Sequence, residues 1–74
     1  MAVLDFNGLL HSARALGNGV EFSYQSSSRA IAVLNTRPRI MELDDVRSDA
    51  VAQESNGRFV VMLPRGQHLV SFDR

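Results

Sequence analysis

Residues 58–72 read Arg58-Phe59-Val60-Val61-Met62-Leu63-Pro64-Arg65-Gly66-Gln67-His68-Leu69-Val70-Ser71-Phe72. Two apolar runs rich in β-branched and aromatic residues, which favour strands, flank a Pro-Arg-Gly turn. Pro64 sets φ for a tight turn, and Gly66 can adopt the positive φ that closes a hairpin with a bulge. The stretch therefore predicts a β-hairpin, strands 58–63 and 68–72, with Arg65 at its tip.

Upstream of this hairpin, three more stretches have the character of strands. Residues 20–24 alternate between apolar and polar, which is typical of a half-buried strand. Residues 30–34 predict a second strand and residues 39–46 a third, with a bend at Pro38 between them. We expect Phe22, Ile31, Val33, Val61 and Leu69 to form the core of the resulting sheet.

The segment between the third strand and the hairpin is mostly polar. Residues 48–57 predict a loop, with half a turn of helix at residues 49–53 as the most regular structure it could hold. Its last three residues, Ser55-Asn56-Gly57, are a turn signal just before the strand that begins at Arg58.

Residues 4–16 have a different periodicity from the rest of the chain. Apolar side chains recur at helical spacing, Asp5 can cap the start, and Gly17-Asn18-Gly19 supplies a stop. The apolar set is Phe6, Leu9, Leu10, Ala13 and Leu16. This pattern predicts a short amphipathic helix, although Gly8 inside it would cost ~1 kcal/mol relative to alanine.

Length and composition limit the architecture to one small domain, residues 1–74. A helix followed by five short strands leaves too few residues for two packed sheets. The sequence therefore predicts a mainly β fold, an N-terminal helix followed by a five-stranded, strongly bent antiparallel small barrel. The last strand has little sequence beyond it to cover its outer edge, which favours edge pairing between copies of the chain.

The net charge limits the kind of partner, and the absence of cysteine limits how the fold can be stabilised. The formal net charge is zero, all eight cations are arginine, and there is no cysteine. Nonspecific binding of polyanions is therefore not the expected bulk behaviour, and no disulfide compensates for the small size. The start of the chain has no basic leader and no apolar run long enough for a membrane span, so we expect a cytoplasmic protein without membrane contact.

Two stretches and the order of elements resemble the Sm and Sm-like proteins, including bacterial Hfq, whose barrel is SH3-like. Residues 63–72 are similar to the family's second motif, in which an Arg-Gly turn precedes a short apolar strand, and residues 39–47 are similar to the end of its first motif. The resemblance implies a homo-oligomeric ring in which residues 58–63 of one subunit pair with residues 68–72 of the next. It also implies that single-stranded RNA binds at the pore.

The chain differs from this family at the positions with which family members recognise an RNA base. The aspartate, the stacking aromatic or histidine, and the asparagine of the family correspond to Thr36, Pro38 and Ile40 here. Arg65 and Gly66 remain, and Arg37 and Arg39 flank the altered positions. The resemblance therefore implies RNA contact through arginines, at Thr36, Arg37, Pro38, Arg39, Arg65 and Gly66, with little preference for uridine.

The alternative function is a protein- or ligand-interaction module that does not bind RNA. Residues 20–24 resemble the small barrels called WYL domains of bacterial regulators, and the altered base-reading positions favour this alternative. We expect no enzymatic activity, cofactor or metal. His11 and His68 lack the spacing of a catalytic pair or a metal site, and the acids at residues 42–49 lack the pattern of a calcium loop.

Overall fold

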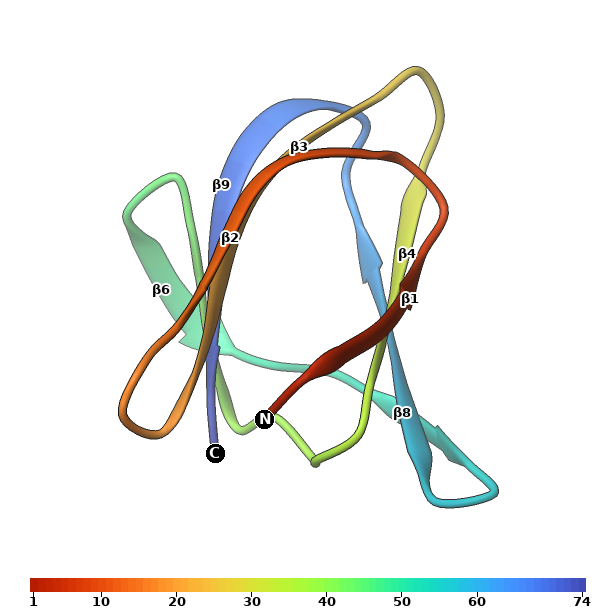
Figure 1. Cartoon of the computed structure of the whole chain (residues 1–74), viewed down its shortest axis with the longest axis vertical. Coiled ribbons are helices and arrows are strands. Elements are labelled where there is room, and N and C mark those ends of the chain that lie inside the picture. The colour runs from red at the N-terminus through yellow and green to blue at the C-terminus, as the bar shows by residue number, and fades with distance from the viewer.

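The computed structural model describes residues 1–74 as nine strands in two antiparallel sheets, with no helix (Figure 1). A four-stranded sheet has the order β1-β4-β8-β7, and a five-stranded sheet has the order β2-β3-β9-β5-β6. The strands are β1 (Val3–Phe6), β2 (Leu9–Ala15), β3 (Gly19–Ser26), β4 (Ala30–Leu34), β5 (Ile40–Leu43), β6 (Val46–Asp49), β7 (Gln53–Ser55), β8 (Arg58–Leu63) and β9 (Gly66–Asp73).

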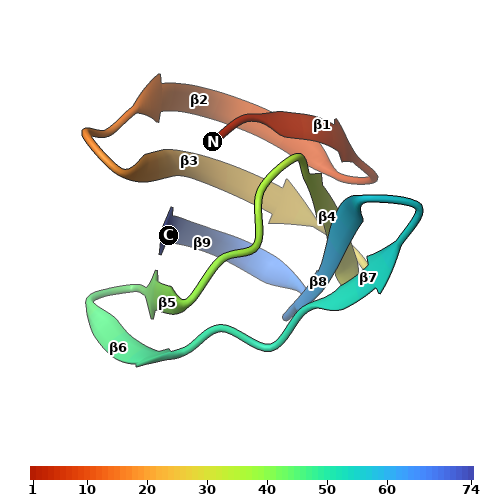
Figure 2. The ribbon, with the colours of Figure 1, turned by 90° about the horizontal axis from the view of Figure 1, so that it is seen from below.

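Three pairs of consecutive strands continue from one sheet into the other through a bend. They are β1 with β2, β4 with β3, and β8 with β9, and the order of these three ribbons is the same in both sheets. Figure 2 shows β2, β3 and β9 stacked as neighbours, with β4, β8 and β7 turned away from them. Bent strands that belong to two sheets form the corners of the fold and hold the sheets face to face over a shared core.

The predicted C-terminal hairpin is wrong, although both of its strands exist. β8 pairs with β4 and β7, whereas β9 pairs with β3 and β5, so β8 and β9 make no ladder with each other. Gly66 has the expected positive φ, 105°, but it turns the chain into the other sheet. The Tyr24 hydroxyl donates a hydrogen bond of 2.8 Å to the carbonyl of Pro64 and so holds this corner against β3.

The predicted N-terminal helix is also wrong, because residues 4–16 form β1 and β2. The chain bends at Asn7 and Gly8, and β2 then pairs with β3 across a two-residue loop at residues 17–18. Apolar spacing over so short a segment fits either a helix or a bent strand. Gly8, which is unfavourable inside a helix, lies at the bend between β1 and β2.

A closed five-stranded barrel does not form. The end strands of the two sheets, β1 and β7 in one and β2 and β6 in the other, pair on one side only, so neither sheet closes on itself. The chain has enough residues for two sheets because three of its ribbons serve both of them.

The middle strands are confirmed with small changes. Residues 20–24 lie in β3, and the second strand is β4 as predicted. The third divides into β5 and β6 at a tight turn, where Asp44 and Asp45 both have positive φ. The loop expected at residues 48–57 contains the end of β6 and all of β7 rather than a helical turn, and Asn56-Gly57 forms the predicted turn into β8.

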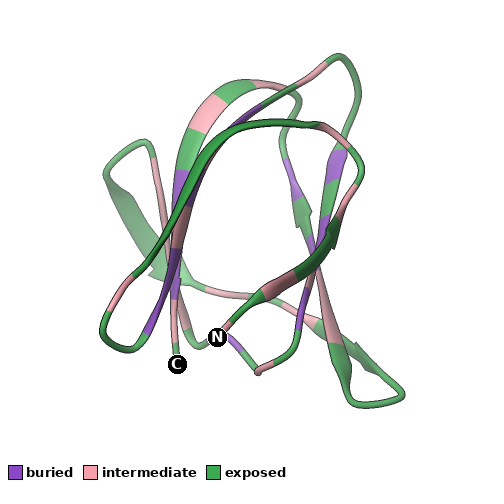
Figure 3. Ribbon diagram, in the orientation of Figure 1, coloured by how far each residue is buried: buried purple, intermediate pink, exposed green.

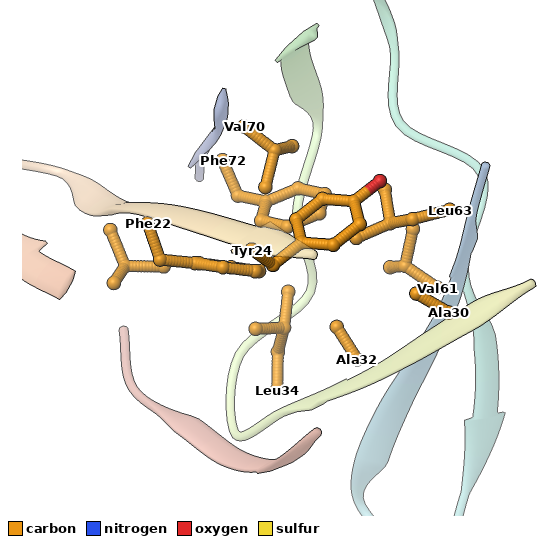
Figure 4. Close-up of a cluster of buried hydrophobic side chains, with 10 residues drawn as sticks. Phe22, Tyr24, Ala30, Ala32, Leu34, Val61, Leu63, Val70 and Phe72 are labelled. Carbon is orange, nitrogen blue, oxygen red and sulfur yellow. The ribbon is translucent and has the colours of Figure 1, made fainter. Parts of the chain in front are cut away.

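The core lies between the sheets and is built around aromatic rings. Phe22, Tyr24 and Phe72 are almost fully buried, and Figure 4 shows their rings meeting the side chains of the facing sheet. The other buried apolar residues are Val20, Ala30, Ala32, Leu34, Val61, Leu63 and Val70. Along β3, β4 and the second half of β9, buried positions alternate with intermediate or exposed ones (Figure 3), so each sheet has an inner and an outer face.

Candidate functional site

The six residues predicted to bind RNA fall in two separate places. Arg65 and Gly66 lie in the corner after the end of β8, whereas residues 36–39 lie in the connection that meets the start of β8. The Arg37 guanidinium lies 4.8 Å from the centre of the Phe59 ring, near that start. A strand of six residues spans about 20 Å, so one chain does not bring the two groups together.

Most residues of the second group have structural contacts. Pro38 is buried, and Thr36 is half-buried. Arg37 makes an ion pair of 3.0 Å with Glu54. The backbone of Arg39 donates to Asp73 and accepts from Ala50, which anchors the connection to β9 and to the segment after β6. The side chains of Arg39 and Arg65 are both exposed and make no ion pair, so among the three predicted arginines only Arg37 is paired with an acid.

A different feature, the outer face of the four-stranded sheet, stands out in the structure. β4 and β8 have apolar side chains on both faces: the inward residues belong to the core, and the outward residues are apolar too, apart from Arg58 at the start of β8. Ile31 pairs with Met62 and Val33 pairs with Val60 in the ladder between β4 and β8. Val51, 81% exposed, shares a hollow of about 420 Å³ with Ile31, Val60 and Met62. We call Ile31, Val33, Val51, Val60 and Met62 the apolar face.

The outer face of the five-stranded sheet has the opposite character. Its strand β3 presents Glu21, Ser23 and Gln25 outward, between the buried positions of the core. Apolar side chains do reach the surface of this sheet: the ladder places Leu69 opposite Ser23, and Leu9, Leu10 and Val46 are exposed on β2 and β6. A contiguous exposed apolar face is typical of a contact surface.

Arginines border the apolar face at both ends of its strands. Arg58 lines a hollow with Val33 and Val60 at the start of β8, and Arg29 directly precedes β4 at the opposite end. Both are exposed, and neither makes an ion pair. Asp5 of β1 is aligned with Val33 and is the acid nearest to this face by register.

Sequence reasoning missed the apolar face, although a signal for it was present. Residues 30–34 and 59–63 are uninterrupted apolar runs, whereas residues 20–24 and 70–73 alternate between apolar and polar residues. An uninterrupted run is the pattern of a strand that is covered on both faces.

A second cluster joins the β5–β6 turn to the corner between β8 and β9. One ring nitrogen of His68, Nδ1, lies 2.5 Å from a carboxylate oxygen of Asp44, and the other, Nε2, lies 2.8 Å from the carbonyl of Arg65. The second Asp44 oxygen accepts a bond of 3.0 Å from the Leu69 N–H. The ring centre of Tyr24 lies 5.6 Å from that of His68. No sequence signal marks this pair, because Asp44 and His68 come from distant parts of the chain.

The contacts in this cluster shift three pKa values. The hydrogen bond to Asp44, and then the bond to the Arg65 carbonyl, raise the pKa of His68 above 6.5. The same bond to His68, and then the Leu69 N–H, lower the pKa of Asp44 below 3.8. Burial, and then the Asp44 charge, raise the pKa of Tyr24 to about 12, so Tyr24 is neutral wherever His68 titrates.

The directions of the Asp44 and His68 pKa shifts determine how this pair changes the stability of the fold with pH. The His68 contribution is complete below pH 6.5 and is lost as the pH rises through the raised pKa. The Asp44 contribution is present above pH 3.8 and is lost as the pH falls through the lowered pKa. The pair therefore stabilises the fold most between pH 3.8 and 6.5.

No family model, curated protein or solved structure matches this chain. The resemblance to Sm-like proteins is therefore still a prediction from the quoted motifs, and the helix and closed barrel that it implied are absent. The structure contains no helix that could span a membrane. The acids of residues 42–49 do not gather with others into a group able to hold a metal ion.

Proposed function

We propose that this chain is a protein-interaction module that docks through the apolar face of its four-stranded sheet. The observation that carries the proposal is that β4 and β8 are apolar on both faces while one of those faces is uncovered. Apolar area removed from water is worth about 25 cal/mol per Å², and a face of several aliphatic side chains can supply the centre of an interface.

The charges around the apolar face specify the kind of partner. Arg58 and Arg29 lie at its two ends and have no acidic neighbour within ion-pair distance. A second copy packed face to face about a two-fold axis would set an arginine against an arginine, because both ends of the strip carry one. A partner with an apolar centre flanked by carboxylates satisfies both the apolar strip and the arginines.

A designed peptide pair tests this assignment. The probe is a fluorescent amphipathic helix with a leucine stripe flanked by glutamates, and the matched control replaces each glutamate with lysine. We expect the acidic peptide to bind and the basic peptide not to bind in fluorescence anisotropy. Amide shifts in an NMR titration should concentrate at Ile31, Val33, Val60 and Met62.

Matched variants separate the contribution of the apolar face to peptide binding from nonspecific hydrophobic binding. Met62→Ser should weaken the acidic peptide about five- to tenfold, whereas Leu69→Ser, at an exposed leucine of the other sheet, should leave binding unchanged. Arg58→Gln should weaken binding and Arg65→Gln should not. Equal binding of both peptides, or shifts centred on the five-stranded sheet, would contradict the proposal.

RNA binding is an alternative outcome of the same assay. A short single-stranded RNA takes the place of the peptide at low salt. Binding that depends on Arg65, weakens steeply with added salt and leaves the apolar face unshifted would replace the present proposal with the RNA-binding ring. β8 and β9 each have neighbours on both sides, so a ring that pairs β8 of one subunit with β9 of the next would require a neighbour of each strand, such as β7 and β5, to move.

A further inference from the structure

We propose that His68 is a pH-operated clamp that fastens the corner between β8 and β9 to the β5–β6 turn. Both ring nitrogens face oxygen atoms that can only accept: a carboxylate oxygen of Asp44 at Nδ1 and the carbonyl of Arg65 at Nε2. A neutral imidazole has one N–H, whereas the imidazolium has two. Only the protonated ring can make both hydrogen bonds at once.

When the His68 ring loses its second N–H proton, the hydrogen bond to the corner between β8 and β9 is lost, whereas the bonds to the β5–β6 turn are kept. A carboxylate is the stronger acceptor, so the remaining N–H stays with Asp44, which also keeps its bond from the Leu69 N–H. The bare Nε2 lone pair then faces the carbonyl oxygen of Arg65, and two acceptors at this distance repel each other. The corner therefore loosens above the pKa of His68 while the turn keeps its bonds.

The groups around His68 support this order of events. Tyr24 packs against the ring from β3 and is neutral, with its pKa raised to about 12. Asp45, in the same turn as Asp44, is exposed and makes no ion pair, and the guanidinium of Arg65 is exposed as well. Asp44 is therefore the acidic group bonded to the ring. The His68 side chain is 23% exposed, so its protons exchange freely with solvent.

The turn offers a matched pair of variants for the test. Asp44 and Asp45 both have positive φ, 51° and 69°, a conformation that asparagine adopts readily. Asp44→Asn and Asp45→Asn should therefore both fold, and only the first changes the charge that contacts His68.

The experiment is an NMR titration of the His68 ring together with the Arg65 carbonyl carbon. In the wild type, the ring should titrate with a midpoint above 6.5, and the Arg65 carbonyl signal should move with the same midpoint. Asp44→Asn should bring that midpoint down toward 6.5, and Asp45→Asn should leave it unchanged. His68→Gln should abolish the movement at Arg65.

Three results would overturn the clamp. One is a wild-type midpoint at or below 6.5. Another is an Arg65 carbonyl signal that does not follow the ring. The third is an equal change of the midpoint in Asp44→Asn and Asp45→Asn.

Discussion

Leu63 and Leu69 have the same side chain, but the fold gives them opposite surroundings. Leu63 is 1% exposed in the core, and Leu69 is 42% exposed on the outer face of the five-stranded sheet. Leu63→Ala should cost about 3 kcal/mol of unfolding free energy because it leaves a cavity, and Leu69→Ala should cost less than about 1 kcal/mol. Urea denaturation followed by circular dichroism measures both. Similar losses in the two variants would mean that the two faces are assigned incorrectly.

At the same residue scale, the sequence indicated only part of the core. Phe22 and Val61 are buried as predicted, whereas Ile31, Val33 and Leu69 point outward. In an uninterrupted apolar run no polar residue shows which face is inside, so the sequence of β4 does not tell Ile31 and Val33 apart from their buried neighbours. The structure instead buries the alternate residues of β4, Ala30, Ala32 and Leu34, which belong to the same core as Phe22 and Tyr24 (Figure 4).

At the scale of elements, the turn from β2 into β3 has one glycine in the loop, Gly17, and one at the start of β3, Gly19, and their roles differ. A Cβ at Gly19 would lie 1.7 Å from the carbonyl oxygen of Phe72, because β3 passes close to β9 there. A Cβ at Gly17 would have nothing within 4 Å. Gly19→Ala should therefore lower the unfolding free energy by about 3 kcal/mol, and Gly17→Ala should be neutral or slightly stabilising.

Thermal denaturation of the two glycine variants measures this difference. A Gly19→Ala protein as stable as Gly17→Ala would show that β3 and β9 are farther apart than the structure places them.

The sequence identified most strands but misplaced their partners. β3, β4 and β8 follow from local residue preference and turn residues, which act over a few positions. The destination of β9 depends on contacts between distant segments, such as the bond from Tyr24 to Pro64, and no local pattern contains that information. The same holds for the candidate sites: the uninterrupted runs contain a signal for the apolar face that the sequence prediction missed, whereas no local pattern marks the Asp44–His68 pair.

At the scale of the whole molecule, three ribbons belong to both sheets, so neither sheet can unfold without exposing the core of the other. We expect one cooperative transition, with the amides of Ala32 in β4 and Phe22 in β3 lost at the same urea concentration. Residue-resolved NMR in a urea series measures this, with the end strands β6 and β7 set aside because strand ends fray. Two separate midpoints would show that the sheets are independent.

The crossing ribbons also determine where this chain can change in length. An extra residue at a corner, such as 64–65, would swap the inner and outer faces of the strand that follows, and that strand pairs on both sides. An extra residue at a hairpin tip, at residues 17–18, 44–45 or 56–57, would lengthen a loop and leave every face in place. Among sequences that share this fold, insertions and deletions should therefore accumulate at the tips, and the corners should keep a constant number of residues.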